Sequence, residues 1–479
     1  MMRCRAQSLV YWLALQAAVY AQGAAVLTRA QAFHRAQQLA DLGRKMFFDA
    51  ALSGSGKLSC ASCHSRSFGY GPPNALSVQR GGRDMTQWGI RAVPSLRYLQ
   101  TVPQFSEHFF EEDSGDDSVD NGPTGGLTWD GRVDRGRDQA RIPLLSPYEM
   151  ANANETAVVA SVRRAAYSQE LTELASGSDD VQEMFRTILE ALEAWEQDYR
   201  EFYPYTSKYD AWLAGKARLS ESEARGWKLF TDPHKGDCAR CHIASRGING
   251  MPPQFTDYGF VALGVPRNRE IPANADPAWY DLGLCGPERT DLRTRNKYCG
   301  SFKTPSLRNV ATRRVFFHNG LVHTLKQAVS FYFERDTEPE KWYPRDRDGH
   351  VLKFDDLPPQ YRANVETGTP FGGHPGDQPA LSDAEIDDVV AFLKTLTDGY
   401  HPAEYAADSH GRNWPQRCDA DALRNRGIDV RNTADAGLAG TSDREHLAFA
   451  ANAGRVTWPA LMISCPISSG AYARSGTSP

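Results

Sequence analysis

The 479-residue sequence lacks the features that define several large protein classes. Beyond its N-terminal segment, no run is long and apolar enough to cross a bilayer, which takes about 20 apolar residues. The net charge at pH 7 is only −5, so there is no basic footprint for nucleic acid. The period-two alternation of strand ladders is also missing. Cysteine and histidine are scarce, with 9 and 12 copies, so a repeated pattern that combines them is informative.

The N-terminus has the pattern of an export signal. Arg3 and Arg5 precede an apolar run from Leu9 to Tyr20, and Ala21 ends a small-residue cleavage site. We expect residues 1–21 to be removed as a signal peptide, which places the mature protein in the periplasm without a membrane span. A retained anchor is the alternative.

The scarce residues meet in two copies of one pattern, Cys60-Ala61-Ser62-Cys63-His64 and Cys238-Ala239-Arg240-Cys241-His242. In a CxxCH motif both thiols bond to the vinyl groups of a haem, and the histidine ligates the iron. A structural zinc site would need two further ligands at a regular spacing, and a redox CxxC needs no trailing histidine. The sequence therefore predicts two covalently bound haem c groups, with His64 and His242 as iron ligands.

Four cysteines remain once Cys4 and the motif cysteines are set aside, namely Cys285, Cys299, Cys418 and Cys465. An oxidising compartment favours disulfides. A bond between Cys285 and Cys299 would close a loop of about 15 residues, worth about 3 kcal/mol. We predict this disulfide, whereas the pairing of Cys418 with Cys465 stays open.

A predicted helix precedes each CxxCH motif. The helix predicted over residues 31–48 has an apolar side of Phe33, Leu39, Leu42, Met46 and Phe47. A shorter helix follows the capping box of Ser220 and Glu223. Gly43-Arg44-Lys45-Met46-Phe47 aligns with Gly226-Trp227-Lys228-Leu229-Phe230, each shortly before its CxxCH. We infer an internal repeat of a helix that leads into a haem site.

Further helices are predicted over residues 181–199 and after the capping box of Ser382 and Glu385. The fold class is therefore mostly α, with one haem in each of two domains, residues 30–203 and 204–400. Residues 333–380 form a long ordered insertion in the second domain, and residues 401–479 a peripheral or partly disordered tail. The acidic stretch from Glu111 to Asp120 is either a solvated loop or a docking patch for a basic partner.

Several further motifs occur in order around the two haem sites. Thr128-Trp129-Asp130-Gly131-Arg132 is followed by Gln139, Pro143 and Glu149-Met150. Phe302-Lys303-Thr304-Pro305-Ser306-Leu307-Arg308-Asn309 and Phe317-His318-Asn319-Gly320 lie beyond the second CxxCH. Over residues 35–400 the sequence resembles the bacterial dihaem cytochrome c peroxidase and MauG superfamily. The resemblance makes the two domains cytochrome c-like.

The resemblance also implies catalytic roles. Glu149 and Gln139 would lie over the first haem, with Pro143 in the same group, and Glu149 would move a proton between the two peroxide oxygens. A carboxylate suits that task when burial brings its pKa toward neutrality. Trp129 would relay electrons between the haems. Without the resemblance, these residues are read as a core Trp, a surface Gln and a helix-capping Glu.

The loop from Phe68 to Leu99 departs from the resemblance. Dihaem cytochrome c peroxidases place a displaceable distal histidine there, about sixteen residues after the haem histidine, and this chain has Arg80 at that position. Met85 could substitute for it, and His108 is read as a surface residue. We expect the first haem to react without prior reduction. The same loop would supply an Asn to an inter-domain calcium ion, and Arg91 in that place argues against calcium.

Tyr332 stands where the second haem has its other axial ligand, which is Met in the peroxidases and Tyr in the MauG branch. A phenolate lowers the iron potential and favours higher oxidation states. The alternative reading of Tyr332 is a core aromatic residue.

The sequence thus predicts a periplasmic dihaem peroxidase of the MauG-like type that shares oxidising equivalents, as high-valent iron, between both haems. Its substrate would be hydrogen peroxide, and its electron donor or protein substrate is left open. The alternatives are a conventional dihaem cytochrome c peroxidase with small cytochrome or cupredoxin donors, and an electron carrier without catalytic activity.

Overall fold

The computed structural model describes residues 27–110, 120–247, 250–401, 455–458 and 461–466. The expected signal peptide, most of the acidic stretch and the side chains of Cys418 and Cys465 lie outside the described residues. The chain forms two compact units, one up to Tyr400 and one from His401 onward. In the second unit, β5 (Arg455–Trp458) and β6 (Leu461–Pro466) pair antiparallel.

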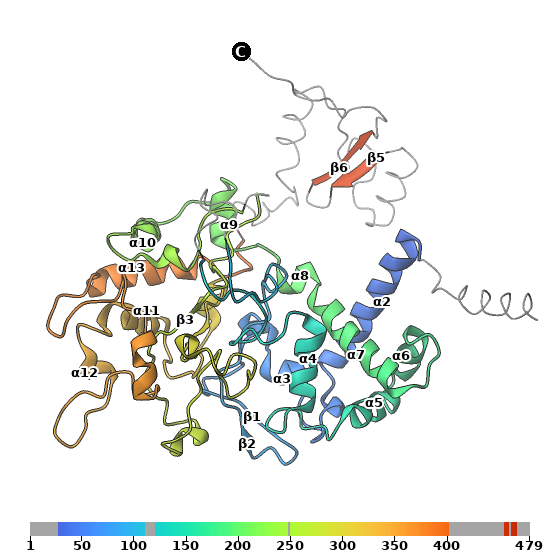
Figure 1. Cartoon of the computed structure of the whole chain (residues 1–479). Helices are drawn as coiled ribbons and strands as arrows, with labels where there is room; N and C mark the ends of the chain where they lie inside the picture. Colours follow the sequence, from blue (N-terminus) through green and yellow to red (C-terminus); the bar gives the residue numbers. More distant parts are fainter. Residues whose placement is uncertain (1–26, 111–119, 248–249, 402–454, 459–460, 467–479) are drawn as a thin grey trace, which may run out of the picture. The chain divides into compact units, whose positions relative to one another are not determined.

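Helices dominate the first unit (Figure 1). Its first half contains α2 (Arg29–Phe47), α3 (Cys60–Cys63), α4 (Gly136–Leu145), α5 (Glu155–Arg163), α6 (Ser168–Leu174), α7 (Val181–Glu196) and α8 (Tyr199–Phe202). Its second half contains α9 (Lys208–Leu213), α10 (Glu221–Thr231), α11 (Leu325–Glu334), α12 (Pro339–Trp342) and α13 (Asp383–Lys394). None of the described helices is both long and apolar enough to span a membrane.

The strands of the first unit are short. They form two antiparallel pairs, β1 (Arg80–Gly81) with β2 (Gln87–Trp88) and β3 (Phe260–Val261) with β4 (Phe302–Lys303). The loops between the helices and strands carry most of the residues that the sequence motifs single out. The prediction of a mostly α fold is correct for the described residues.

Two separate hydrophobic cores support the two halves. The first core runs from Leu42 to Phe202 and includes most of the buried face of α7. The second runs from Tyr209 to Leu396 and collects aromatic residues around Phe392. The cores divide the chain between Phe202 and Tyr209, near the boundary expected from the sequence. Helices α4–α7 lie on one side of the unit in Figure 1, and α10–α13 on the other.

Each half is built around one close helix crossing. Gly43 of α2 lies against α7, and Gly226 of α10 lies against α13. A Cβ atom at Gly43 would come within 1.8 Å of the Ala191 carbonyl oxygen, and one at Gly226 within 1.9 Å of the Asp388 carbonyl oxygen. Only glycine fits such a contact between backbones without moving the helices apart. The repeat in the sequence is therefore a repeated helix crossing ahead of each CxxCH.

Helix ends follow the capping signals closely. Ser220 with Glu223 and Ser382 with Glu385 form complete capping boxes, as predicted. Helix α7 ends at Glu196 rather than near Tyr199, because the chain turns at Gln197 before α8 begins. Phe33 was assigned to the apolar side of α2, and this was wrong: it is 64% exposed, since the helix reaches the core only from Leu39 onward.

Cys285 and Cys299 form a disulfide across a sequence separation of 14, with their Cα atoms 5.0 Å apart. Both are buried in a small cluster with Leu284, Leu292 and Tyr298. The bond closes the loop between β3 and β4, which carries several of the charged residues described below.

Candidate active site

The two motif histidines have matching surroundings. The Nδ1 atom of His64 lies 2.9 Å from the Tyr70 carbonyl oxygen, and that of His242 lies 2.9 Å from the Phe255 carbonyl oxygen. A carbonyl only accepts, so Nδ1 carries the proton in both rings and Nε2 presents the lone pair that a metal needs. Burial lowers the pKa of His64 to about 4 and also lowers that of His242. Both rings are therefore neutral, as iron ligands must be.

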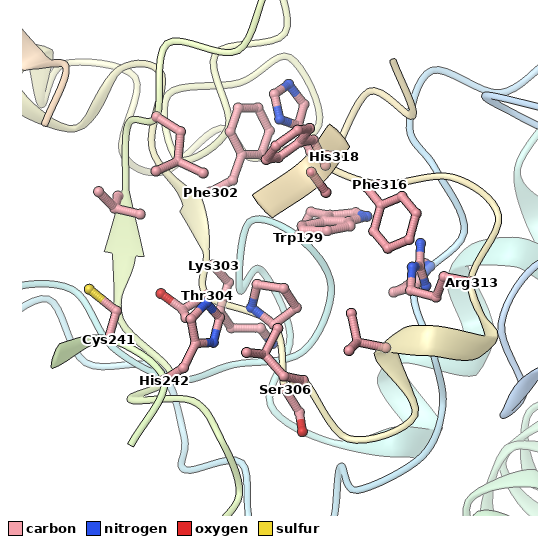
Figure 2. A pocket seen from close by; sticks show the side chains of 18 of the residues that line it. Trp129, Cys241, His242, Phe302, Lys303, Thr304, Ser306, Arg313, Phe316 and His318 are labelled. Carbon is pink, nitrogen blue, oxygen red and sulfur yellow. The ribbon is translucent and has the colours of Figure 1, made fainter. Parts of the chain in front are cut away.

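A large, mainly apolar cavity is lined by residues of both halves. From the first half it is lined by Phe68, Leu96, Trp129, Gln139 and Glu196, among others. From the second half it is lined by Cys238, Cys241, His242, Tyr332 and Phe371, among others. Figure 2 shows Trp129 in the middle of this space, with Cys241 and His242 on one side and Arg313 and Phe316 on the other.

The cavity fits haem chemically. A haem has a flat apolar ring and two anionic propionates. Lys303 and Arg313 line the cavity, and neither has a carboxylate within ion-pair distance among the described residues. Burial lowers the pKa of Lys303 to about 8 and that of Arg313 to about 10, because nothing nearby compensates their charges fully. Buried cations without counter-charges call for an anionic ligand.

The thiols are ready for attachment. In the part of the chain that is described, Cys60, Cys63, Cys238 and Cys241 are free cysteines. Burial raises the pKa of the first three to about 12 and that of Cys241 to about 11, so all four are protonated thiols. Cys60, Cys63 and His64 would hold one haem, and Cys238, Cys241 and His242 the other.

Trp129 is fixed between the halves by two hydrogen bonds. Its indole Nε1 donates to the Ala92 carbonyl at 2.8 Å, and its own carbonyl accepts from the Lys303 backbone N–H at 2.9 Å. Lys303 belongs to β4, so the bond ties the Trp129 loop directly to the second half. The indole therefore occupies one orientation, as an electron relay requires.

Gln139 and Glu149 come from one continuous segment. Gln139 lies in α4 and lines the cavity. Pro143 lies inside the same helix, and its carbonyl accepts from the Met150 N–H at 3.0 Å, which anchors the turn that carries Glu149. The Glu149 carbonyl also accepts from the Gly82 N–H at 2.8 Å, beside β1.

Glu149 has the electrostatic character of an acid–base group. Burial raises its pKa, while the Ser146 hydroxyl and Arg132 oppose the shift. Its charge in turn raises the pKa of the Cys63 thiol, which places it beside the first CxxCH motif. The structure thus places Glu149 beside the first CxxCH motif, whereas Gln139 lines the cavity, whose lining includes neither Glu149 nor this motif.

Tyr332 lies in α11 and faces the second CxxCH motif across the cavity. Its ring stacks on Phe371, with centroids 5.5 Å apart, and Phe371 belongs to the insertion over 333–380. Burial raises the pKa of the phenol. The hydroxyl is therefore neutral unless a metal cation replaces its proton.

Three residues were considered for the distal position of the first haem, namely Arg80, Met85 and His108. Arg80 is exposed, and its guanidinium carbon lies 4.2 Å from the centre of the Trp88 ring across the β1–β2 hairpin. His108 is exposed, and its Nδ1 lies 2.6 Å from the Asp120 carboxylate. Met85, like these two residues, is not among the residues that line the cavity.

Arg91 occupies the position at which calcium was considered. Its guanidinium donates to Asp281 at 2.6 and 2.8 Å and to Asp130 at 2.6 Å, and all three side chains are buried. Arg132 adds a second cation to Asp130 at 2.8 Å. These positive groups already neutralise the carboxylates, so the residues present do not fit an additional cation.

Three cavity residues were not assigned roles from the sequence. Glu196, at the end of α7, has its pKa raised to about 8 by burial. His318 stacks on Phe302 with ring centroids 3.5 Å apart, and burial lowers its pKa to about 4. Arg313 is the third. His318 belongs to the motif over 317–320, and Glu196 is a carboxylate in the last turn of an amphipathic helix, whereas no local pattern marks Arg313.

The chain is similar to dihaem peroxidases and MauG proteins in sequence and structure. A family model described as di-haem cytochrome c peroxidase matches residues 37–218. Methylamine utilization protein MauG of Paracoccus denitrificans is 31% identical over 383 residues, which cover 75% of this chain and 88% of that protein. Cytochrome c551 peroxidase of Nitrosomonas europaea is 30% identical over 295 residues, covering 61% of this chain and 71% of that protein. Among solved structures, the diheme peroxidase BthA of Burkholderia thailandensis E264 is 40% identical with a TM-score of 0.66, covering 75% of this chain and 86% of that one.

Proposed function

Because the chain belongs to the dihaem cytochrome c peroxidase and MauG family, we propose that it is a periplasmic haem peroxidase of the MauG-like type. It holds two haem c groups and acts on hydrogen peroxide at the first. His242 and Tyr332 would hold the second haem, and Trp129 would carry oxidising equivalents between the two haems. The observation that supports this proposal is the half-buried Glu149 beside the first CxxCH motif, where burial raises the pKa of its carboxylate.

Glu149, Gln139 and Pro143 would have separate roles in the cleavage of the peroxide O–O bond. The haem iron supplies the atom that binds peroxide and the electrons that reduce it. Glu149 takes a proton from the nearer peroxide oxygen and gives it to the farther one, which then leaves as water. A carboxylate whose pKa is raised by burial performs both transfers efficiently near neutral pH. The Gln139 amide orients the peroxide, and Pro143 shapes the helix that presents this amide.

The loop over 68–99 contains no histidine that could serve as a displaceable distal ligand, so the first site should be open to peroxide in the oxidised protein. Cys60, Cys63 and His64 would hold the haem and would leave a position for the substrate. This favours an enzyme over an electron carrier, because a carrier needs strong ligands on both faces of both irons.

The decisive experiment replaces Glu149 by Gln in the dihaem protein. We expect peroxide turnover to fall at least a hundredfold, because general acid–base catalysis contributes about 10²–10⁴-fold. Both haems should stay attached, as judged by mass and optical spectrum. Glu170→Gln, at an exposed ion pair with Lys45, is the matched control and should keep full turnover. Unchanged turnover in Glu149→Gln would remove this carboxylate from the mechanism.

A conventional dihaem cytochrome c peroxidase is the second candidate, and the similarity to cytochrome c551 peroxidase favours it. The two candidates differ in their electron donor. Rapid turnover with reduced small cytochromes or cupredoxins supports the conventional peroxidase. Failure of these donors, together with a stable oxidised state of both haems after stoichiometric peroxide, supports the MauG-like type.

A further inference from the structure

We propose that Arg313, a residue of the second half, binds a propionate carboxylate of the first haem and so joins the second half to the reactive site. The inference rests on the haem binding proposed above and adds a residue that the sequence motifs do not assign.

Arg313 lies next to the loop that carries the first haem histidine. Its Nη2 donates to the Val93 carbonyl at 3.1 Å, and its Nε donates to the Val315 carbonyl at 3.2 Å. A Cβ atom at Gly71 would lie 3.5 Å from its Nη1, and Gly71 follows Tyr70, whose carbonyl orients His64. The charge of Arg313 also acts on the His64 ring. The guanidinium is therefore at the first haem site, although its backbone belongs to the second half.

Arg313 and Trp129 both hydrogen-bond to one short backbone segment, residues 92–93. The Trp129 indole donates to the Ala92 carbonyl, and Arg313 donates to the next carbonyl along, that of Val93. The guanidinium and the indole are thus held by neighbouring carbonyls of one segment, residues 92–93. Figure 2 shows Arg313 beside Phe316 at this edge of the cavity.

The charge of Arg313 lacks the partners that comparable arginines have. Arg313 is half-buried. The unit's buried arginine side chains, those of Arg91, Arg267, Arg289, Arg308 and Arg335, each have a carboxylate within 3.1 Å. Among the described residues Arg313 has none, and its Nη1 makes no hydrogen bond. Leaving a buried cation uncompensated is costly, so the site is completed by an anion that reaches it through the cavity.

A haem propionate is the anion that this position fits. It is a carboxylate, which pairs with a guanidinium through short charged hydrogen bonds. It arrives with the haem held by Cys60, Cys63 and His64, whose loop already contacts Arg313. A free anion in the cavity is the competing occupant, and it would exchange with solvent whereas a propionate would not.

The test uses Arg313→Met in the complete dihaem protein. Loss of a buried positive charge stabilises the oxidised, more positive iron, so the reduction potential of the first haem should fall. We expect at least a tenfold shift in the equilibrium constant for its reduction, about 59 mV for one electron. The propionate bending band of that haem in resonance Raman spectra should shift as well. Arg313→Lys keeps the charge and should retain most of the native potential.

Arg314→Met is the matched control, because Arg314 is the exposed neighbour and its guanidinium lies over the Phe68 ring at 4.7 Å. It should leave both measurements unchanged. Equal potentials and Raman bands in Arg313→Met and the native protein would overturn the proposal. So would a potential that depends on chloride concentration in the native protein, which indicates a free anion. If Arg313→Met does not fold, Arg313→Lys and Arg313→Gln are compared instead. A shift in the reduction potential of the first haem as large in Arg313→Lys as in Arg313→Gln overturns the proposal. An active dihaem enzyme with an unaffected Arg313→Met variant refutes this inference alone, whereas a native protein without haem refutes the proposed function.

Discussion

Replacing Arg91 by Met should strongly destabilise the protein, because the guanidinium is the main partner of two buried carboxylates. The Arg91 side chain is 9% exposed, and those of Asp130 and Asp281 are 0% and 6% exposed. Breaking a buried ion pair by removing one partner costs about 3–5 kcal/mol. Asp130 keeps Arg132, whereas Asp281 has no other cation within ion-pair distance among the described residues. Most of the penalty should therefore arise at Asp281.

The acid dependence of stability provides a second magnitude. Arg91 and Arg132 lower the pKa of Asp130 from its usual 3.8 to about 2 against the effect of burial. At about 1.4 kcal/mol per pKa unit, this shift contributes roughly 2–3 kcal/mol. Because the pKa is lowered in the folded state, the contribution is fully present above about pH 4 and is lost as the pH falls toward 2. The difference in free energy of unfolding between the native protein and Arg91→Met should therefore become smaller as the pH falls from 4 to 2.

Guanidinium chloride unfolding of the dihaem protein at pH 7, followed by far-UV circular dichroism, measures the stability lost in Arg91→Met. Repeating the unfolding at pH 4 and pH 3 measures how this loss depends on pH. The double variant Arg91→Met with Asp281→Asn should recover part of the loss, since the unpaired carboxylate is gone. A loss below 1 kcal/mol at pH 7, or one that does not change toward acid pH, would refute the reasoning. Chelators should not alter the stability of the native protein, because Arg91 takes the place of a metal cation.

Three further predictions concern other parts of the unit. Gly226→Ala should lower the free energy of unfolding by at least about 1–3 kcal/mol, although alanine favours helix, because the new Cβ would come within 1.9 Å of the Asp388 carbonyl oxygen. Gly89→Ala is the control and should be nearly neutral, since its nearest contact would be 3.5 Å away. A more stable Gly226→Ala protein would contradict the close helix crossing. Replacing Cys285 and Cys299 together by Ser should cost about 3 kcal/mol, and an unchanged unfolding midpoint would show that the loop is held by other contacts. Tyr332→Met should raise the reduction potential of the second haem in spectroelectrochemical titration while leaving the first haem unchanged, and identical spectra would rule out Tyr332 as a ligand.

The local features of this fold could be predicted because their causes are local. Capping boxes at Ser220 and Ser382 depend on residues three positions apart, and a CxxCH motif contains its own ligands. The role of Arg313 could not be predicted in this way. Its contact with Val93 joins residues 220 positions apart, and no local pattern shows which buried arginine lacks a carboxylate. The Arg91 network has the same character, since Asp281 lies 190 positions away.

The sequence also could not locate the exposed end of α2. Helical periodicity extends through Phe33, but only the tertiary structure determines where the opposing surface of α7 ends. The distal loop is a more favourable case. The lack of a histidine there is visible in the sequence, and the structure adds that Arg80 turns to Trp88 instead.

The bond from the Lys303 N–H to the Trp129 carbonyl has a consequence for biosynthesis. The first half closes its own core at Phe202, so in the exported protein proposed above, whose N-terminal half crosses the membrane first, it can fold before the second half. The wall that holds Trp129 in place, however, comes from β4 and is synthesised much later. A haem attached to Cys60 and Cys63 in the interval would lie in an unfinished pocket. The peroxide site proposed for the first half therefore stays incomplete until β4 of the second half has folded against it.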